Sequence, residues 1–531
     1  MLCRFLVMLR HFLALYCVAP VVPCVTVVLC VSGTLAADEA TTVDLTPHRQ
    51  PGQLSRVTTA YEVAGSLTLA DEDKPTQVPL AVSATATYDE RLLGVEPAED
   101  IDGKSSPGSS RRSARYYEQQ DVKLLINGKE VIPQLRNSRR LIGASFSEGR
   151  LTIFSPQGPL TREELDLVQW PGDSLVADAL LPETSVEVGG TWQVDEAMLE
   201  ALLNIDTVGQ SDVSAELIET NRDYAKIDAK GVVHGTVDGA TTTIEIKSRC
   251  YFDLRRRRVH SLQLVVNEKR SAGEVSPGVE AVAKVRLQFA PLSRSDSLSD
   301  SVVAKMGAVP NADAIQLSFL PTNRVYRLLH DRYWHVTSDA KSAVVLRKMQ
   351  DGDVLGQCNI SALPVIEKGK QVTLESFRDD VRSTLGKNFG RFVKAGEFVD
   401  QRGRLVYHVE AEGKVTDVPI HWRYYLVGEP DGRRAALVFT LEQSMVARFG
   451  RADRQILSGF NFLASGTTAK SPPPADQVRE RAIENPLPRP PQPPLAPTAG
   501  MPDNAAGLPA SKEAAVPQRV GRRDEGFRAR R

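Results

Sequence analysis

The chain has 531 residues, 42% of them hydrophobic and 25% charged, and its 65 basic and 66 acidic side chains leave a formal net charge of −1. This composition is typical of globular domains, and such a balance of charge argues against a dedicated nucleic-acid binder. Only two of the six cysteines, Cys250 and Cys358, lie beyond residue 37, which excludes a small disulfide-stabilised scaffold. Because both lie in apolar, strand-like patterns, we expect two buried thiols, with a disulfide between them as the alternative.

The first 37 residues have the pattern of an export signal. Arg4, Arg10 and His11 give a cationic start, the stretch Phe12–Val31 has no charged side chain, and small residues follow up to Ala37. The sequence therefore predicts a signal peptide over residues 1–37 and a secreted protein of the periplasm or cell surface. Since about 20 apolar residues suffice to span a bilayer, an uncleaved N-terminal anchor is the alternative. We expect membrane contact only in that case.

A polar tether is predicted over residues 38–55, and a first domain over residues 56–292. Apolar residues alternate along Val57–Leu69 and again along Val78–Tyr88, as in strands that have one face on a core. The segment Gly103–Ser110 is rich in Ser and Gly and is predicted to be a mobile loop.

Three local motifs refine the first domain. The pair Asn127-Gly128 readily adopts positive φ angles and predicts a two-residue hairpin turn. The run Thr161–Glu164 is a capping box that opens a short helix. A second helix is expected over Asp195–Leu203, and its apolar side carries Met198, Leu199, Leu202 and Leu203.

Four long alternating segments complete the first domain: Tyr224–Val237, Thr241–Leu254, Val259–Lys269 and Val279–Phe289. Neighbours in sequence usually pair, so these segments predict an antiparallel meander with one apolar face. Such a face must either pack on a helix or curl around a cavity. A cavity would suit a carrier of an apolar or lipid ligand, and we expect that interpretation to fail if the Asp195–Leu203 helix fills the face.

The second half of the chain is predicted to hold a linker, a domain and a tail. Residues 293–315 lose the alternating pattern and form the linker, and residues 316–464 form the second domain. In that domain we expect a strand at Trp334, strands at Ala343–Lys348 and Val354–Ser361, a helix at Leu374–Phe389, three more strands, and a final helix from Val446 to Phe460. Residues 465–531 contain 13 of the 33 prolines and are predicted to be a disordered, Pro-rich tail.

The best candidate site is a hairpin of the second domain. With a loop at Gly413–Thr416, His408 is predicted to face His421, on the side of the sheet that also carries Glu410, Glu412 and Arg423. Two opposed histidines with a carboxylate can hold a metal. A solvated strand face gives the same pattern, and a nearby arginine opposes a cation, so the sequence favours the solvated face.

Other chemical motifs are weak. The pair His330 and His335 would point to opposite faces of a strand. The runs Arg255–Arg258 and Arg111–Arg115 can grip an anion, but solvated turns are the commoner explanation. No Gly-x-Ser-x-Gly motif and no complete phosphate loop is present. We therefore predict no catalytic residues, no metal and no cofactor.

The second domain resembles the PsbP-like fold, an antiparallel sheet flanked by helices. The residues that carry the resemblance are Tyr333–Val336, the Leu374–Phe389 helix, Trp422–Tyr425, Ala435–Gln443 and Arg454–Phe460. Members of this family are mostly binding or assembly factors, so the resemblance implies binding, and it assigns no active-site residues.

The first domain is similar to exported bacterial proteins of unknown role that share the pattern of Val186–Trp192, and more loosely to LolA-like lipid carriers. The sequence thus predicts an α+β protein in which a long-stranded curved antiparallel sheet is followed by a PsbP-like sandwich, with disordered termini. The favoured function is non-enzymatic binding or scaffolding in the cell envelope, with an unknown protein, lipid or wall polymer as partner. The alternatives are the lipid carrier and an envelope-polymer hydrolase that uses His408 and His421.

Overall fold

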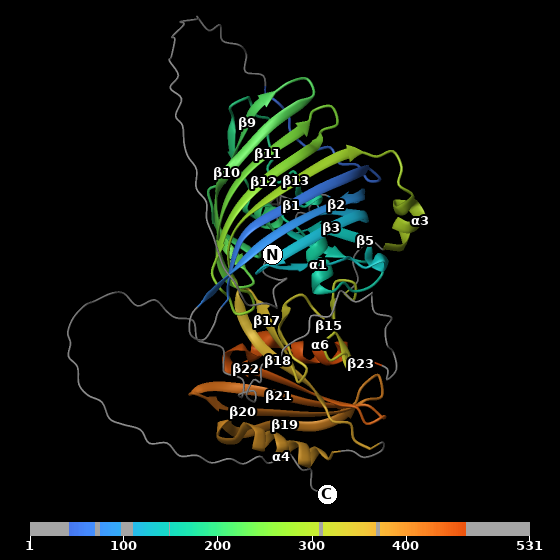
Figure 1. The fold of residues 1–531 in the computed structure, drawn as a ribbon, viewed down its shortest axis with the longest axis vertical. Helices are drawn as coiled ribbons and strands as arrows, with labels where there is room; N and C mark the ends of the chain where they lie inside the picture. The colour runs from blue at the N-terminus through green and yellow to red at the C-terminus, as the bar shows by residue number, and fades with distance from the viewer. Residues whose placement is uncertain are drawn as a thin grey trace, which may run out of the picture. The chain divides into compact units, whose positions relative to one another are not determined.

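The computed structural model describes residues 42–69, 75–96, 110–147, 149–306, 312–367 and 372–463. These residues form three antiparallel sheets of thirteen, seven and three strands with few helices, so the fold is α+β and rich in sheet (Figure 1). No helix in the described part combines the length and apolarity that a membrane span requires. The predicted signal peptide, residues 103–109 of the predicted loop and the Pro-rich tail lie outside the described residues.

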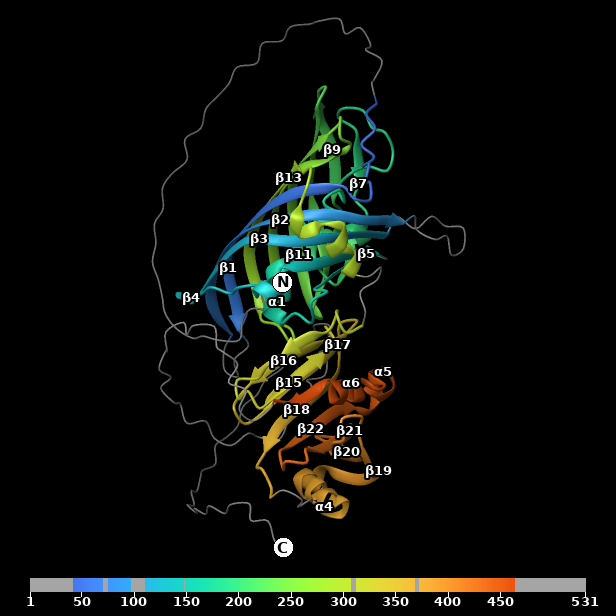
Figure 2. The same ribbon diagram turned by 90° about the vertical axis from the view of Figure 1, so that its right-hand side faces the viewer.

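The thirteen-stranded sheet, here called the long sheet, has eleven strands in the order β6-β5-β3-β2-β1-β13-β12-β11-β10-β9-β7, and β4 and β8 pair with β3 and β10 beside this path. Its long strands are β1 (Leu54–Leu69), β2 (Thr76–Glu96), β3 (Ser110–Ile126), β10 (Tyr224–Val237), β11 (Ala240–Asp253), β12 (Arg258–Arg270) and β13 (Gly278–Pro291). Its short strands are β4 (Lys129–Val131), β5 (Leu141–Ser147), β6 (Arg150–Phe154), β7 (Thr191–Gln193), β8 (Thr207–Ser211) and β9 (Ser214–Thr220). Figures 1 and 2 show the long strands lying side by side as one bent sheet.

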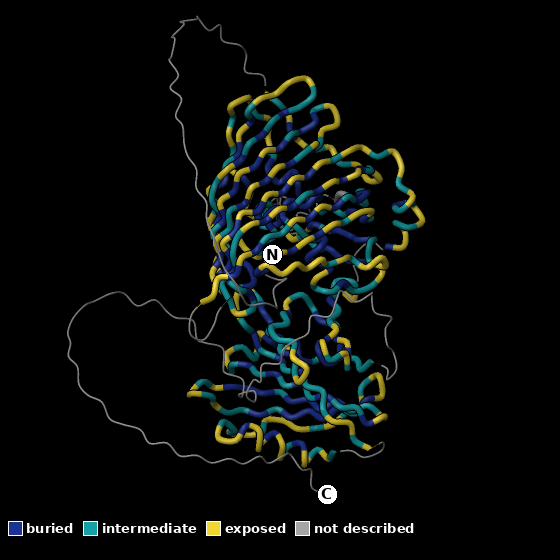
Figure 3. Tube along the Cα trace, viewed as in Figure 1, coloured by how far each residue is buried: buried dark blue, intermediate teal, exposed yellow. Residues whose placement is uncertain are grey.

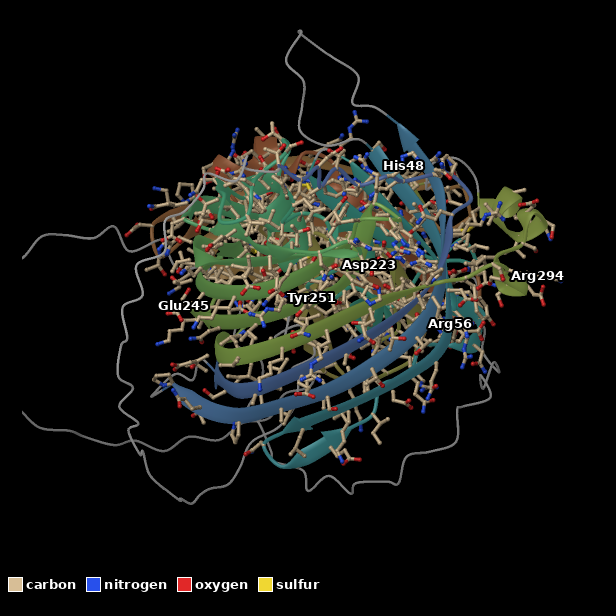
Figure 4. All side chains as sticks on the ribbon, turned by 90° about the horizontal axis from the view of Figure 1, so that it is seen from above. His48, Arg56, Asp223, Glu245, Tyr251 and Arg294 are labelled. Carbon is tan, nitrogen blue, oxygen red and sulfur yellow. The ribbon has the colours of Figure 1, made fainter. Side chains whose placement is uncertain are left out.

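The predicted four-strand meander is confirmed as β10 to β13. Buried and exposed residues alternate along each strand (Figure 3), because successive side chains point to opposite faces. We call the buried side the inner face; it carries Ile246, Leu264 and Val285. Figure 4 looks along the sheet and shows Glu245 on the opposite side. The turns between paired strands use the expected residues, with positive φ at Asn127, Gly128, Asp238 and Gly239.

Two short helices pack beside the long sheet, α1 (Arg162–Val168) and α2 (Glu196–Leu203). The capping box is confirmed: the Thr161 hydroxyl accepts the Glu164 N–H at 3.2 Å, and the Glu164 carboxylate accepts the Thr161 N–H at 3.0 Å. In α2, Leu199, Leu202 and Leu203 are buried in the core cluster of the long sheet. The helix packs against β6 and β8, which belong to the two outer parts of the sheet, so its apolar side is filled there.

A buried charge network fastens the segment after α1 to the inner face. Arg115 is fully buried and donates from Nη1 and Nη2 to the Asp173 carboxylate at 2.7 and 2.6 Å, and from Nε to Glu90 at 2.8 Å. Nearby, Arg111 forms an ion pair with Asp178, with Nη1 and Oδ1 2.7 Å apart. The prediction of a solvated turn is therefore wrong for Arg111 and Arg115, because β3 turns these two side chains toward Asp178 and Asp173.

Two connecting segments pack more closely than predicted. The residues expected to form a tether contribute Leu45, which is 1% exposed and belongs to the core of the long sheet. The expected linker contains the helical turns η3 (Asp296–Leu298), α3 (Asp300–Val303) and η4 (Ala304–Met306). Leu298 and Met306 are buried there beside Ala114, so isolated apolar residues anchor segments whose composition is otherwise polar.

The remaining strands form two sheets. The seven-stranded sheet has the order β16-β17-β18-β22-β21-β20-β19, and the three-stranded sheet has the order β14-β15-β23. The bounds in the seven-stranded sheet are β16 (Trp334–Asp339), β17 (Val344–Gln350), β18 (Asp353–Leu363), β19 (Phe389–Val399), β20 (Leu405–Val415), β21 (Val418–Gly428) and β22 (Arg434–Glu442). Those in the three-stranded sheet are β14 (Leu317–Phe319), β15 (Tyr326–His330) and β23 (Phe460–Phe462).

Helices cover both faces of the seven-stranded sheet (Figure 1). On one face, α4 (Leu374–Leu385) buries Phe377 and Val381 against β20 and β21. On the other, α5 (Val446–Phe449) and α6 (Ala452–Gly459) bury Phe449 and Ile456. Short 3-10 turns extend these helices at η5 (Gly386–Asn388) and η6 (Gln443–Met445), and η1 (Asn137–Arg139) and η2 (Ser174–Val176) lie by the long sheet.

Three predictions for this part of the chain need correction. The helix predicted over Leu374–Phe389 ends at Leu385, and Phe389 already begins the edge strand β19, so four strands lie between α4 and α5 instead of the predicted three. The predicted final helix is two helices, because Gly450 between them has φ +56°, a conformation that ends α5. The three-stranded sheet of β14, β15 and β23 was not predicted at all.

Candidate functional site

The hairpin of β20 and β21 has a different register from the predicted one. The turn is at Thr416-Asp417, and Glu412 lies opposite His421, Glu410 opposite Arg423 and His408 opposite Tyr425. The predicted pairing of His408 with His421 is therefore wrong. Each partner moves by an even number of residues, so every side chain keeps its predicted face, because side chains alternate with a period of two.

The polar face of this hairpin is buried, which corrects the prediction of a solvated face. His408 and His421 are each 4% exposed. Helices α5 and α6 and their connecting turn lie over this face, and His408 stacks on Tyr425 with ring centroids 4.6 Å apart. The sequence could not show this because the covering helices lie 25 or more residues farther along the chain.

A carboxylate lies between the two histidines. Glu410 Oε1 is 3.1 Å from His408 Nε2, and Glu410 Oε2 is 3.3 Å from His421 Nε2. The two imidazoles and the nearby Arg423 hold the pKa of Glu410 well below its usual range, against the effect of burial. The ring nitrogens make these contacts at poor hydrogen-bond angles, so both Nε2 atoms lack an aligned partner. Among the described residues no group of three or more His, Cys, Asp or Glu side chains has metal-binding geometry.

A pocket of about 520 Å³ opens beside this cluster, between the hairpin and the start of α6. We call it the α6 pocket; its lining residues are Lys394, Glu410, Arg423, Tyr425, Gly450, Arg451, Asp453 and Arg454. Lys394, Glu410 and Arg423 lie next to one another on three adjacent strands, since Lys394 is paired with Glu410 and Glu410 with Arg423.

The two carboxylates of the α6 pocket already have partners. Asp453 accepts a hydrogen bond from the Tyr425 hydroxyl at 2.5 Å and one from Arg423 Nη1 at 3.0 Å. Glu410 lies between the histidines. Burial and the Asp453 carboxylate raise the pKa of Tyr425 well above its usual value, so the phenol stays a hydrogen-bond donor.

The cations of the α6 pocket are less fully paired. Lys394, Arg451 and Arg454 have no ion pair with a carboxylate in the part of the chain that the structure describes. The Arg454 guanidinium lies 4.9 Å from the Phe398 ring and 5.3 Å from the Tyr425 ring. The Nε of Arg423 is buried without a hydrogen-bond partner, and Arg451, the N-cap of α6, places no side chain on the free N–H groups of that helix.

Sequence analysis identified Glu410, Arg423 and the two histidines but missed Lys394, Arg451 and Arg454. A signal for the arginines was present, because Arg448, Arg451 and Arg454 recur every third residue. Lys394 carries no such signal: it lies next to a bulge in the exposed edge strand β19 and reaches the site only through strand pairing.

The other candidate residues do not form a second site. In the turn between β11 and β12, Arg255, Arg256 and Arg257 pair with Asp223, Asp253 and Asp44. His330 is buried at the end of β15, and burial lowers its pKa to about 4. The expectation of two buried free thiols is confirmed for Cys250 and Cys358, which carry no disulfide.

The chain matches no known protein family and no curated protein. It shows weak similarity in fold to solved structures, among them cyanobacterial PsbP (CyanoP) from Synechocystis sp. PCC 6803, at 16% identity over 30% of this chain and 96% of that one, with a TM-score of 0.23. Lipovitellin matches at 12% identity over 47% of this chain and 27% of its own, with a TM-score of 0.27. A protein from Bacteroides thetaiotaomicron matches at 11% identity over 28% of this chain and 49% of its own, with a TM-score of 0.21. Similarities of this size carry no information on function.

Proposed function

We propose that the protein is an exported, non-enzymatic binding protein of the cell envelope whose α6 pocket holds an anionic group of its partner. One observation carries the proposal: four cations and only two carboxylates line the pocket, for a net formal charge of +2, and both carboxylates are held by other side chains. The volume of about 520 Å³ lies within the usual range of ligand sites.

The same groups favour binding over acid–base chemistry. A general base works best with a pKa near the operating pH. The pKa of Glu410 is held far below that range and the pKa of Tyr425 far above it. Both groups therefore keep one protonation state at neutral pH, which suits a site that fixes a charge and does not exchange protons with a substrate.

The ligand chemistry follows from the donors. Guanidinium groups such as that of Arg454 bind oxyanions through paired N–H donors. The uncapped start of α6 adds free backbone N–H groups and the positive end of the helix dipole. Phosphate or carboxylate groups on a lipid or wall polymer of the envelope fit this combination.

The binding half of the proposal is tested with the full chain and inorganic phosphate in isothermal titration calorimetry. We expect the double variant Lys394→Gln/Arg454→Gln to raise the Kd for phosphate about tenfold or more, since two charged donors are lost. The matched control Lys414→Gln/Arg327→Gln removes two exposed cations elsewhere, and we expect it to change the Kd by less than about twofold. Equal phosphate affinity in both double variants would contradict the proposal.

The export half is tested separately, by fractionating cells and sequencing the N-terminus of the mature protein. The small residues that end at Ala37 predict a mature chain that begins at or close to Asp38. Recovery of the chain from the cytosol with Met1 in place would overturn this half without affecting the phosphate measurement.

A further inference from the structure

Two arginines without an acidic partner lie on α4, beside the exposed edge strand β19. The guanidinium carbons of Arg378 and Arg382 lie 4.8 and 5.2 Å from the centre of the Phe392 ring, and that of Arg382 lies 5.4 Å from the centre of the Phe389 ring. The two rings also contact each other, with centroids 4.7 Å apart. Among the described residues neither arginine forms an ion pair with a carboxylate. Stacking on aromatic rings holds a guanidinium plane in place and leaves the N–H donors at its edge free for an anion.

The packing of α4 positions these arginines. Phe377 and Val381 are buried against the sheet, and Arg378 and Arg382 are the next residue along in each case, so they lie on the flank of the helix. This flank is the one toward β19, since α4 packs against that strand (Figures 1 and 2). The two arginines are four residues apart, so they are neighbours on one side of the helix and form a pair of cations.

A bulge in β19 places the arginine pair and the α6 pocket on opposite faces of the same strand. Phe392 pairs with Ala411 and Lys394 pairs with Glu410, and Val393 is the extra residue between them. Ala411 belongs to the core beneath α4, whereas Glu410 and Lys394 line the α6 pocket. No described strand pairs with the outer side of β19, and most of its residues are exposed. A ligand that leaves the α6 pocket at Lys394 therefore reaches the arginine pair by crossing one exposed strand.

The surface between the two sets of cations suits charged groups better than acyl chains. The exposed large apolar residues of β19 are two valines, Val393 at 46% and Val399 at 65% exposure, so a lipid would find little apolar surface for its chains. The acids on the same two elements form no ion pair with the arginine pair or with Lys394 among the described residues; they are Glu375, Asp379, Asp380 and Glu397. The cations on both faces of β19 thus remain available to a ligand.

We propose that the partner is a linear polymer whose repeating unit carries a phosphate, and that it runs from the α6 pocket across β19 to Arg378 and Arg382. The inference rests on the proposed function, because the α6 pocket holds one of the anionic groups of the polymer. It narrows the partner to a wall polymer and excludes a lipid with one headgroup, since only repeated charges contact both sets of cations. Once one phosphate is bound, the next contact is intramolecular, so the polymer binds more tightly than a single phosphate without any new interaction in the pocket.

The test compares inorganic phosphate with long-chain polyphosphate in isothermal titration calorimetry of the full chain. We expect the Kd per phosphate to be about tenfold lower or more for the long chain. The double variant Arg378→Gln/Arg382→Gln should raise the Kd for the long chain about tenfold and change the Kd for inorganic phosphate by less than about twofold. The control Lys414→Gln/Arg327→Gln removes the same charge elsewhere and should change neither Kd by more than about twofold. Equal affinity of the two double variants for long-chain polyphosphate would overturn the proposal.

The inorganic phosphate measurement also separates the two proposals. Unchanged phosphate binding in Arg378→Gln/Arg382→Gln shows that the variant is folded. A native chain that binds inorganic phosphate but holds the long chain no more tightly per phosphate overturns this inference and leaves the proposed function standing, whereas no binding of inorganic phosphate overturns both. Vesicles of phosphatidylglycerol and polyglutamate are the remaining ligands. Stronger dependence of either one than of polyphosphate on the arginine pair would assign this surface to a membrane or to an acidic protein segment and contradict the proposal.

Discussion

Replacing Arg115 by methionine should destabilise the protein by about 3–5 kcal/mol. The side chain is fully buried and makes three charge-assisted hydrogen bonds, two to Asp173 and one to Glu90. Methionine keeps the length of the side chain but leaves two carboxylates that are only 4% and 6% exposed without their cation. The magnitude reflects these uncompensated charges more than the lost bonds, because removing one partner of a buried pair is costlier than removing the whole pair.

A variant that removes the whole charge network serves as the control for Arg115→Met, which removes only the cation. Urea unfolding followed by circular dichroism is compared for native protein, Arg115→Met, and the triple variant Arg115→Met/Glu90→Gln/Asp173→Asn. The amides still accept the hydrogen bonds from Ser113, Ser174 and the Leu175 N–H but carry no charge. We expect the triple variant to be more stable than Arg115→Met with a similar denaturant slope. A single variant within about 1 kcal/mol of native, or a triple variant less stable than the single one, would refute the reasoning.

Three further predictions follow from the hydrogen bonds and pKa directions. The folded protein holds the pKa of Glu410 below its unfolded value, so the native chain should be more stable than Glu410→Gln above about pH 5. This difference in stability should disappear as the pH falls through the folded pKa of Glu410. Urea titrations in which the difference grows on acidification would contradict the prediction. Thr161→Ala removes the cap of α1 and should cost about 1 kcal/mol, whereas Thr161→Ser should cost less in the same measurement. Burial raises the pKa of Cys250 to about 12 and holds the pKa of Cys358 well above its usual value, so iodoacetamide should label neither thiol in native protein and both in urea. Labelling of either thiol before unfolding, detected by mass spectrometry, would exclude buried thiols.

The parts of the fold that could be predicted are those specified by neighbouring residues. Strands β10 to β13 alternate over most of their 13 to 14 residues, with one register shift between β11 and β12 near Phe252, and are joined by turns such as Asp238-Gly239. Period and turn chemistry together fix such strands. The edge strand β19 was missed because most of its residues are exposed, so no alternation is visible from Phe389 onward.

The candidate site shows why the remainder could not be predicted. The composition of the hairpin favoured a loop over Gly413–Thr416, yet Thr416 and Asp417 both adopt positive φ and move the turn toward β21. Each side chain of the hairpin still lies on its predicted face, because the register error is an even number of residues. The burial of His408 was not predicted, because it depends on α5 and α6, and these are two helices because Gly450, with φ +56°, ends α5.

The charged side chains on the polar face of the β20–β21 hairpin lie beneath α5 and α6, and comparing their ion-pair partners locates the candidate site better than any sequence motif does. Asp453 accepts hydrogen bonds from Arg423 and Tyr425, and Glu410 lies between two imidazoles, so both carboxylates of the α6 pocket have partners. Three cations of the same pocket, Lys394, Arg451 and Arg454, form no ion pair with a carboxylate among the described residues. Lys394 and Arg451 are exposed and Arg454 is half-buried, so the excess of positive charge at this pocket attracts an anion by electrostatics and not through unsatisfied buried donors.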